Sequence, residues 1–542
     1  MDVGTISIVL VIALLFLLAI GMPLGLASAV LAALVMIMKF EPTLLTDPMS
    51  FGSGILTSNP GTGPLYLLTQ KITDLMTEYV LISVPLFIFM AALLERSGIA
   101  KQMYDSLDFW LSRVRGGVAI VTSIMAVLMA AMSGIIGGEV VLLGLIALPQ
   151  MLRLGYNQNL AIGTICASGS LGTMIPPSIV LIIYGLITET SIKALFTGAF
   201  IPGFMLASFI IIYIVVRTQL DPSQAPLPEP EEGDPEGREK SLMFLGFVSA
   251  IVAGVIALML ARIALYTATG RNDASVENFE PPSFGMVGDI PMLLVIGAVA
   301  LALIFFVSGK ERTAVAWSKG KGLVPPLAVI GIVLGSIYGG VTGITEAAGM
   351  GALAVFMIAW FRGEASVDLL WTSMMRTLRS TGTIIWVTIG AAALAGAYTL
   401  AGGSTYIAQL IVGAEMPTML VILTMMLILL FMGAFMDWVG IVLLIIPVFL
   451  PIVKRLPIDE IGFIGQLSPT HISIWFGVLF CMNMQVSFLS PPFGPAAFYL
   501  KSVAPSHISL TDIFRGFLPF IGIQLLALSV MLIWPSIVTL LL

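Results

Sequence analysis

Four short stretches of this sequence combine glycine, proline and small polar residues inside long apolar runs. They are SGIIGGE at 133–139, GTMIPPS at 172–178, GAFMD at 433–437 and SPPFG at 490–494. A proline removes one helical hydrogen bond and blocks the carbonyl four residues back, so each Pro-Pro pair leaves carbonyl oxygens without a helical partner. Such carbonyls suit a small hard cation such as sodium, and the free N–H groups of the next half-helix suit a carboxylate. The pattern predicts cation sites that flank an anion site.

Two acidic residues, Glu139 and Asp437, stand at the ends of two of these stretches. An ionised carboxylate that faces lipid costs roughly 2.5–3.5 kcal/mol on insertion scales, so both should face a cavity or a polar partner. Three roles are compatible with such a position: cation coordination, proton carriage, or capping of the half-helix that follows. Capping and a direct functional role explain the two acids equally well.

Small polar side chains accompany the interruptions. The hydroxyl residues are Ser133, Ser168, Ser170, Thr173, Ser487 and Ser490. Hydroxyls in membrane helices also form helix–helix hydrogen bonds of about 0.6–2 kcal/mol, so packing explains each of them as well as ligation does. Asn483 and Gln485 lie in the run before the second Pro-Pro pair and are predicted to line a polar site.

The composition places these residues in a lipid bilayer. Of 542 residues 58% are hydrophobic and 10% are charged, whereas soluble domains carry about 25% charged residues. A net charge of −6 without a long basic block gives a nucleic-acid partner no electrostatic basis. Two cysteines exclude a disulfide framework. No P-loop, HExxH or GxSxG motif occurs, so we expect neither an enzyme nor an organic cofactor.

A membrane crossing needs about 20 predominantly apolar residues, and such runs recur along the whole chain. The predicted main crossings are 5–20, 23–38, 79–94, 159–187, 197–216, 241–262, 290–308, 323–340, 345–361, 381–400, 473–500 and 514–540. Lys and Arg in short loops prefer the cytoplasm, which places the loops at 95–116, 309–321 and 362–379 on that side. The acidic, proline-rich stretch after residue 217 is predicted to be an exposed cytoplasmic linker.

Two further apolar stretches, 117–152 and 418–452, are interrupted by glycine and are too long for one crossing. The loop before 117–152 and the linker after residue 217 are both predicted to be cytoplasmic. The crossings 159–187 and 197–216 already account for the even number of crossings between them, so 117–152 must begin and end on the same side of the membrane. It is therefore predicted to be a re-entrant hairpin that enters from the cytoplasm. The same count predicts that 418–452 is a hairpin entering from the opposite face, with Lys454 and Arg455 outside.

The two halves of the chain repeat one another. Pro176-Pro177, Cys166 and Tyr184 recur at a constant offset of 315 residues as Pro491-Pro492, Cys481 and Tyr499. The topology above places the copies in opposite orientation, which is the inverted-repeat plan of secondary transporters. We predict a first repeat at 1–216, an acidic linker with two extra transmembrane helices at 217–322, and a second repeat at 323–542. Unwound main chain from both halves is expected to meet around a wet central pocket.

Several motifs in combination resemble one family. They are MSGIIGGEVVLLGLIALP, GYNQNLAIGTICASGSLGTMIPPSIVLIIYG, GGVTGITEAAGMGALA, MGAFMDWVGIVLLIIP and LSPPFGPAAFYL. Together they resemble the large membrane (DctM-like) subunit of tripartite ATP-independent periplasmic (TRAP) transporters. The chain departs from that pattern where many members have SGSAVAD and TPPVG. The resemblance implies an elevator-type transporter, in which the hairpins and broken helices move as one block against a scaffold.

The resemblance also implies candidate site residues. The implied sodium ligands are Ser133, Gly134, Ser168, Gly169, Gly172 and Pro176 in the first repeat and Gly433, Asp437, Asn483, Ser490, Pro491 and Gly494 in the second. The candidate substrate ligands are Thr173, Ser178, Gln485 and Ser487, with Glu139 as the acid at the first hairpin tip. Sodium is the only metal ion expected.

The resulting prediction is sodium-coupled import of a small organic carboxylate across the bacterial inner membrane. The family resemblance implies two protein partners, a small four-helix membrane subunit and a periplasmic substrate-binding protein. Two alternatives stay open. One is a sodium- or proton-coupled anion carrier of related architecture that works without a binding protein. The other is a membrane scaffold that does not transport.

Overall fold

The computed structural model describes residues 2–45, 64–111, 113–134, 136–227, 235, 237–268, 287–413 and 416–542. Throughout these ranges the regular structure is helical, without strands. Nine of the described helical segments are long and apolar enough to cross a membrane. Each predicted crossing coincides with a helix or a pair of helices, which confirms the predicted all-α polytopic fold.

The helices fall into three consecutive groups along the chain. The first group is α1 (Val3–Ala19), α2 (Leu24–Phe40), α3 (Pro64–Thr77), α4 (Ser83–Arg96), α5 (Ile99–Leu111), α6 (Gly117–Ser133), α7 (Gly138–Arg153), α8 (Gln158–Gly169), the short turn η3 (Ser170–Thr173), α9 (Ile179–Thr188) and α10 (Ile192–Leu220). The second is α11 (Gly237–Ala268), α12 (Ile290–Ala302), α13 (Lys310–Gly320) and the turn η8 (Lys321–Leu323). The third is α14 (Val324–Tyr338), α15 (Ile344–Phe361), α16 (Val367–Leu400), α17 (Gly403–Val412), α18 (Thr418–Gly433), α19 (Trp438–Leu444), α20 (Ile446–Val453), α21 (Ile472–Leu489), α22 (Pro495–Lys501) and α23 (Leu510–Ile533).

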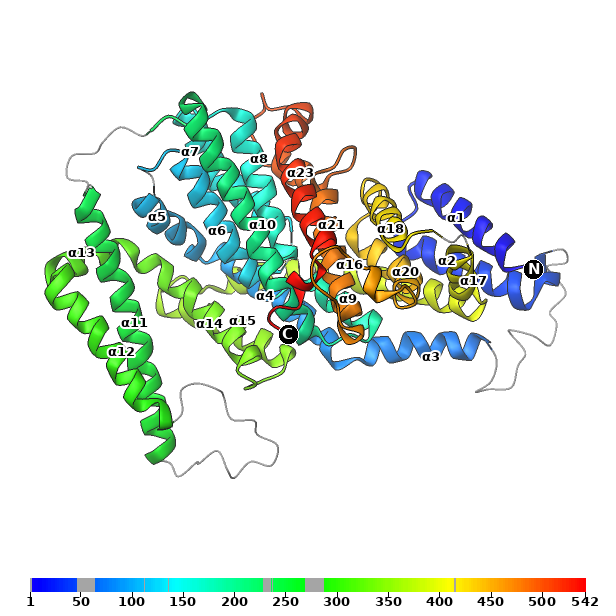
Figure 1. Ribbon diagram of the computed structural model, residues 1–542, viewed down its shortest axis with the longest axis horizontal. Coiled ribbons are helices and arrows are strands. Elements are labelled where there is room, and N and C mark those ends of the chain that lie inside the picture. Colours follow the sequence, from blue (N-terminus) through cyan, green and yellow to red (C-terminus); the bar gives the residue numbers. More distant parts are fainter. Residues whose placement is uncertain are drawn as a thin grey trace.

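The first and third groups pack against one another in reciprocal pairs. Helix α2 packs on α16 as α15 packs on α4, and α8 packs on α23 as α21 packs on α10. In the same way α7 contacts α22 while α20 contacts α9. In Figure 1, α8, α10, α21 and α23 lie side by side near the centre of the molecule. Exchanged contacts of this kind are what two similar units related by an approximate two-fold axis make, so they confirm the internal repeat.

The four predicted interruptions are real breaks in helices. Helix α6 ends at Ser133 and α7 begins at Gly138, with Gly134 at φ +63° and Gly137 at φ +111°. Glycine adopts such angles without the steric cost that other residues meet, so the chain can reverse there. Helices α18 and α19 form the corresponding hairpin of the second unit. The Pro176-Pro177 and Pro491-Pro492 pairs, both cis, separate α8 from α9 and α21 from α22.

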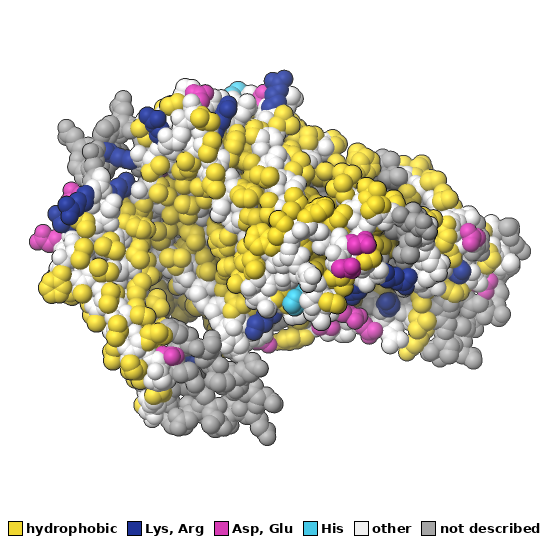
Figure 2. Space-filling model, in the orientation of Figure 1, with side chains coloured by type: hydrophobic (Ala, Val, Ile, Leu, Met, Phe, Trp, Pro, Cys, Tyr) yellow, Lys and Arg dark blue, Asp and Glu magenta, His cyan; other side chains and the backbone are white. Residues whose placement is uncertain are grey.

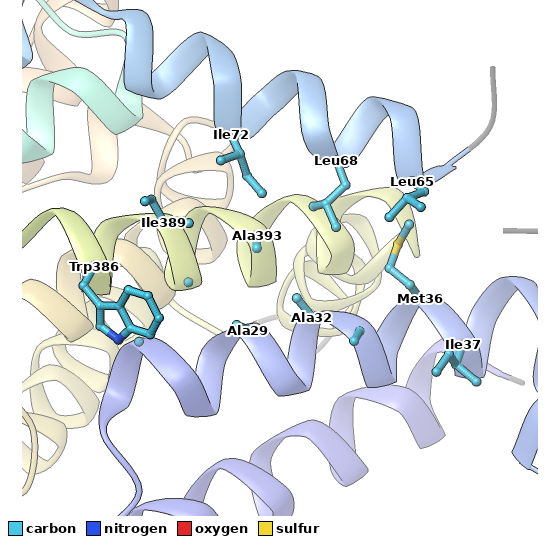
Figure 3. Close-up of a pocket in the computed structure, with 13 residues that line it drawn as sticks. Ala29, Ala32, Met36, Ile37, Leu65, Leu68, Ile72, Trp386, Ile389 and Ala393 are labelled. Carbon is cyan, nitrogen blue, oxygen red and sulfur yellow. The ribbon is translucent and has the colours of Figure 1, made fainter. Parts of the chain in front are cut away.

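The α2–α16 crossing shows why small residues are needed in the frame of the molecule. A Cβ atom on Gly390 would overlap the Gly25 carbonyl, and one on Gly25 would lie 2.6 Å from the Trp386 ring. Beside the crossing, α2, α3 and α16 enclose an apolar cavity of about 350 Å³ (Figure 3). Small residues allow such close approach of membrane helices because packing, rather than water exclusion, holds them together.

The three segments predicted to be basic loops are largely helical instead. Residues 99–111 form α5, residues 310–320 form α13, and residues 367–379 are the first turns of the 34-residue helix α16. The Ser366 side chain caps α16, a local signal for a helix start that the hydropathy argument did not use. Arg376 and Arg379 therefore lie on a helix rather than in a loop.

The middle group touches the rest mainly through α13 and η8, while α11 and α12 extend outward. Helices α11 and α12 pair with each other and lean away from the main body in Figure 1. An ion pair between Arg312 and Glu239 (3.6 Å) joins α13 to α11. Figure 2 shows a broad apolar surface with charged side chains gathered mostly toward its rims, as a bilayer-embedded protein requires. Much of the predicted linker (228–234 and 236) and of the loop after α11 (269–286) lies outside the described residues.

Candidate functional site

A buried carboxylate lies where the first hairpin meets the first broken helix. Glu139, in the first turn of α7, is fully buried. The Ser133 hydroxyl donates a hydrogen bond to its Oε1 atom, while Oε2 has no hydrogen-bond partner among the described residues. A Cβ on Gly172 would lie 2.6 Å from Oε1, so only glycine leaves room for this carboxylate. Ser133, Gly172 and Glu139 therefore form one oxygen-rich cluster.

The main chain of the hairpin tip and that of the broken helix are in direct contact at the same place. The Gly134 carbonyl accepts a hydrogen bond from the Ile179 N–H at 3.2 Å. A Cβ on Gly134 would lie 2.5 Å from the Pro177 carbonyl oxygen. Pro176 is buried beside this contact. The main chain of the broken helix at Pro177 and Ile179 is thus packed directly against the hairpin tip.

The other candidates of the first repeat have different partners. The Ser168 hydroxyl pairs with that of Ser123 at 2.9 Å. Gly169 allows Val140 of the hairpin to approach, since a Cβ there would lie 2.6 Å from the valine side chain. Ser178, predicted as a substrate ligand, caps α9 by accepting from the Leu181 N–H.

Two polar residues of α21 bond to other elements, Gln485 to the first broken helix and Asn483 to the hairpin helix α18. The Gln485 side-chain amide donates to the Thr173 hydroxyl at 2.7 Å, although the residues are 312 positions apart. The Asn483 amide donates to the Met426 carbonyl at 2.9 Å. The side-chain oxygens of Asn483 and Gln485 are buried and have no hydrogen-bond partner in the described part of the chain. They are therefore available to a ligand.

The second set of candidates is more open than the first. Gly433 lies against Ser487, with no room for a Cβ between them. Asp437 precedes α19 and is exposed, in contrast to Glu139. Pro491 is also exposed, whereas every residue of the first interruption, 172–178, is buried. The two halves of the repeat thus have similar sequences at the breaks and different access to them.

Two hydrogen bonds hold the chain in place at the second break. The Ser490 hydroxyl donates to the Val486 carbonyl at 2.8 Å, and the Gly494 N–H donates to the Ser490 carbonyl at 2.9 Å. Ser490 therefore already has a hydrogen-bond partner within its own helix. Its hydroxyl oxygen can still accept or coordinate through its lone pairs.

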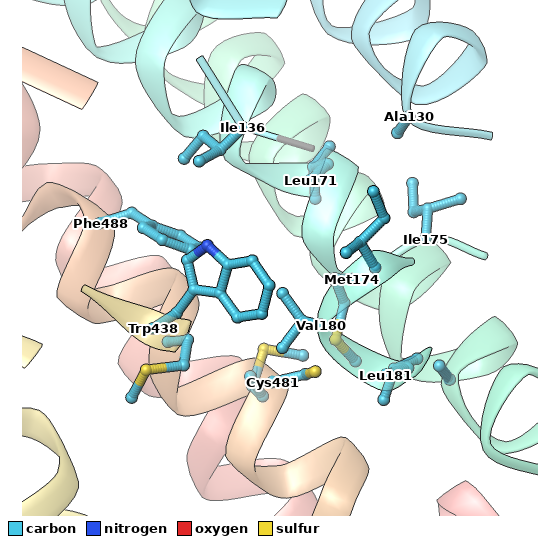
Figure 4. Packing of buried hydrophobic residues seen from close by; sticks show 14 of the residues in the cluster. Ala130, Ile136, Leu171, Met174, Ile175, Val180, Leu181, Trp438, Cys481 and Phe488 are labelled. Atoms are coloured by element: carbon cyan, nitrogen blue, oxygen red, sulfur yellow. The ribbon is translucent and has the colours of Figure 1, made fainter. Parts of the chain in front are cut away.

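Apolar side chains from both units pack between the two breaks, beside the Thr173–Gln485 hydrogen bond. Ile136, Trp438 and Phe488 are buried there together with Leu171 and Met174 (Figure 4). The physical reason lies in the first hairpin tip, where an isoleucine occupies a position that faces the second unit.

A polar cavity of about 860 Å³ lies to one side of these apolar side chains. The first hairpin contributes Ser133, Gly137 and Gly138, and α22 contributes Tyr499. The remaining polar lining comes from α4 and α16: Glu95, Arg96, Thr372, Arg376, Arg379 and Ser380. Both repeats thus enclose the cavity, and it carries three arginines against one acid.

The charged wall of this cavity was not among the predicted site residues. Arg376 forms an ion pair with Glu95, which lies 281 positions earlier in the chain. A Cβ on Gly138 would overlap the Glu95 carboxylate, so the hairpin tip sits directly against this pair. Arg379 follows Arg376 by three positions, which puts both on one face of a helix. That spacing and the helix start at Ser366 are the signals that could have revealed them.

The predicted substrate ligands do not line the cavity. Thr173, Ser178, Gln485 and Ser487 are buried in the core behind it. Of the predicted sodium ligands, Ser133 lines it. The described residues include no group of three or more His, Cys, Asp or Glu that could hold a metal ion. A cation here would be held by one carboxylate with hydroxyl and carbonyl oxygens, ligands that suit hard cations.

Comparison with known proteins identifies the fold and the family. The family model for the tripartite ATP-independent periplasmic transporter, DctM component, matches residues 10–537. The chain is 26% identical to the C4-dicarboxylate TRAP transporter large permease protein DctM of Pseudomonas aeruginosa, over 87% of this chain and 88% of that protein. It is 22% identical to the isethionate TRAP transporter permease protein DctMQ of Oleidesulfovibrio alaskensis, over 88% of this chain and 60% of that protein.

A solved structure shows the same overall architecture at low identity. It is MtrF of Neisseria gonorrhoeae, described as illuminating a class of antimetabolite efflux pumps, with a TM-score of 0.52 and 14% identity. The match covers 94% of each chain and concerns the fold alone. The match of the family model over nearly the whole sequence shows that the chain belongs to the DctM component family of tripartite ATP-independent periplasmic transporters.

Proposed function

We propose that this chain imports a small organic carboxylate by sodium coupling, through an elevator movement of the hairpins and broken helices. The observation that carries the proposal is the arrangement at the first hairpin tip. There the buried carboxylate of Glu139, with one unpartnered oxygen, lies beside Ser133, and Ser133 also lines the arginine-bearing cavity. A cation site and an anion site thus share one wall.

Family membership supplies the setting of this proposal. As a TRAP large permease, the chain is a secondary transporter of the inner membrane and not an enzyme. Permeases of this family work with a small membrane subunit and a periplasmic binding protein. For this chain we propose the small subunit as a separate four-helix protein, and a binding protein that delivers the acid.

The oxygen cluster at Glu139 supports sodium as the coupling ion. Unwound main chain and half-helix ends coordinate sodium in transporters built from inverted repeats. Ser133 and Gly172 lie against the Glu139 carboxylate, and Gly134 packs on the main chain of Pro177 and Ile179. The unpartnered oxygens of Asn483 and Gln485 offer further acceptors between the two units.

The arginines of the cavity support an anionic substrate. Arg376 is already paired with Glu95, whereas Arg96 and Arg379 are exposed in the same wall. A guanidinium group binds a carboxylate with two parallel hydrogen bonds. The names of two relatives, a C4-dicarboxylate permease and an isethionate permease, both describe anions.

The membrane potential is sufficient to drive the proposed uptake. One positive charge moving through 100 mV releases about 2.3 kcal/mol. Two sodium ions moving with one singly charged anion carry a net charge of one, and the sodium gradient adds to this; with a doubly charged dicarboxylate the same net charge needs a third sodium ion. The Lys and Arg content of the neighbouring segments 95–116 and 362–379 supports a cytoplasmic mouth of the cavity, where a substrate would be released.

Uptake of a radiolabelled C4-dicarboxylate by proteoliposomes tests the proposal. We expect uptake to require a sodium gradient, the small subunit and the binding protein together. In the same assay Arg379→Gln should raise the KM for the acid about 10-fold or more, since a hydrogen bond to a charged group contributes about 1.5–3 kcal/mol. Arg153→Gln, which removes an exposed arginine outside the cavity, is the matched control.

The same assay separates the alternatives. Equal uptake without the binding protein would favour a carrier that works alone. Uptake of no dicarboxylate, sulfonate or sugar acid under any ion gradient would favour a scaffold. Uptake driven equally well by a proton gradient in the absence of sodium would contradict sodium coupling.

A further inference from the structure

A second polar cavity, of about 520 Å³, lies away from the transport site. It is enclosed by α5, the end of α13, η8 and the start of α14, with the C-terminal end of α15 at its edge. Its polar lining includes Gln102, Asp105, Ser106, Lys319, Lys321 and Arg362. None of these residues lines the cavity at the first hairpin tip.

The walls of this cavity are fastened to one another. The Ser106 hydroxyl donates a hydrogen bond to the Lys319 carbonyl at 2.9 Å. A Cβ on Gly322 would lie 2.6 Å from the Ser106 hydroxyl oxygen, so η8 rests directly on α5 only because this residue is glycine. Lys319 and Lys321 are thereby held beside α5 at fixed positions.

The charge of the lining is mainly positive. Lys319, Lys321 and Arg362 face a single lining acid, Asp105. Arg362 also forms an ion pair with Glu364 at 3.0 Å. In the part of the chain that the structure describes, no ion pair is found for either lysine, and the Lys319 ammonium lies 5.7 Å from the centre of the Phe109 ring. The lining therefore includes two lysines without an ion-pair partner among the described residues.

The cavity is placed at the level of a membrane interface. Trp317 and Trp360 are exposed and lie two positions from Lys319 and Arg362, respectively. Tryptophan gathers where the headgroups meet the hydrocarbon, and the Lys and Arg content of 95–116 and 309–321 predicts the cytoplasmic side. Helix α14 leads away from the cavity and exposes Leu327, an apolar side chain suited to lipid.

We propose that this cavity binds the phosphate headgroup of an anionic phospholipid, such as phosphatidylglycerol. Basic pockets between membrane helices on the cytoplasmic side recognise such headgroups through their phosphate oxygens. The two ammonium groups and the Arg362 guanidinium supply the charge, and Gln102 supplies an amide donor. The adjoining exposed tryptophans and apolar helix favour a lipid over a free phosphate ion, because only a lipid also has acyl chains to place there.

The location gives such a lipid a structural consequence. Helix α5 packs on α6 of the first hairpin and also on η8, which leads into α14 of the second repeat. A headgroup held between α5 and η8 would therefore bridge the two repeats at the point where the middle segment joins them. We expect it to stabilise the α5–η8 contact.

Lipid titration of the purified full-length chain tests the proposal. Bound lipid is first removed from the chain with detergent. Phosphatidylglycerol or phosphatidylcholine is then added, and native mass spectrometry counts the lipid molecules that bind. We expect retention of phosphatidylglycerol by the natural chain and a loss of affinity of about 10-fold or more in the double variant Lys319→Gln/Lys321→Gln. Lys319→Arg/Lys321→Arg should keep most of the affinity.

Three controls make the result decisive. Lys454→Gln/Arg455→Gln removes the same charge elsewhere and should leave phosphatidylglycerol binding unchanged. Asp105→Asn should strengthen binding, because it removes the one negative charge of the lining, so the proposal stays testable even if the lysine variant does not fold. Equal phosphatidylglycerol binding by the natural chain, Lys319→Gln/Lys321→Gln and Asp105→Asn would overturn the proposal. Competition by millimolar inorganic phosphate as strong as that by the lipid would show a free-anion site instead.

Discussion

At the scale of single residues, Glu139 is the side chain whose environment departs most from that of an ordinary helix acid. It is fully buried, one of its oxygens lacks a partner, and Gly172 leaves space for it. A buried charge without compensation is costly, and we propose that a bound cation provides that compensation. If Glu139 served only as a cap of α7, the space that Gly172 leaves for its carboxylate would not be needed.

We expect Glu139→Gln to raise the sodium concentration for half-maximal uptake about 10-fold or more. The reason is that the amide cannot supply the negative charge, and a contact to a charged group contributes about 1.5–3 kcal/mol. Sodium titrations of proteoliposome uptake measure the effect. Glu311→Gln, on the exposed surface of α13, is the control and should behave like the natural chain. An unchanged sodium response in Glu139→Gln, with normal thermal stability, would remove Glu139 from the cation site.

At the scale of helices, the α2–α16 crossing is the contact with the least tolerance for larger side chains. Gly390 meets the Gly25 main chain directly, and Trp386 covers the crossing from the side. The reciprocal pairing of α15 with α4 completes the frame against which the hairpins would move. The frame should therefore depend on its small residues more than on its polar ones.

Gly390→Leu should destabilise the protein by about 1–3 kcal/mol or more, since the added side chain must force two main chains apart. Gly331→Leu is the matched control, because a Cβ at Gly331 of α14 meets nothing within 4 Å. The midpoint of thermal unfolding in detergent measures both. Equal midpoints for the two variants would show that the α2–α16 contact is not tight in the membrane protein as purified.

At the scale of the whole molecule, the two breaks differ in access although their sequences correspond. The first interruption is buried and the second has Pro491 at the surface. In a transporter with two related halves, exchange of these two environments would reverse the access of the site. The polar cavity lies where the first hairpin touches the α4–α16 frame, so an elevator movement would change that contact.

Distances between spin labels test this movement. Labels replace Leu145 on α7 and Leu353 on α15, which are both exposed; the two native cysteines are buried. We expect the α7–α15 distance distribution to shift when sodium and substrate are added or removed. A pair at Leu26 of α2 and Leu353, within the frame, should not change. Identical distributions for the α7–α15 pair in every condition would contradict an elevator mechanism.

The sequence by itself determined the class of molecule and the places where its helices break. Hydropathy gives the crossings because each depends on a local run of apolar residues, and proline pairs give the interruptions because a proline acts on its own helix. The recurrence of Pro, Cys and Tyr at one offset revealed the repeat. The helical start of α16 was readable too, from its Ser cap, but the arginines there were interpreted as loop residues.

Only the tertiary structure decided which of these residues meet. The Glu95–Arg376 pair and the Thr173–Gln485 hydrogen bond each join positions hundreds of residues apart, so no local pattern contains them. The apolar packing between the two breaks likewise depends on the tertiary structure, because Ile136 and Trp438 come together only once both hairpins are folded. The motifs at the two breaks are similar, so they did not indicate that the first break is buried and the second exposed. Solvent access depends on how the two units are placed and not on the residues within either.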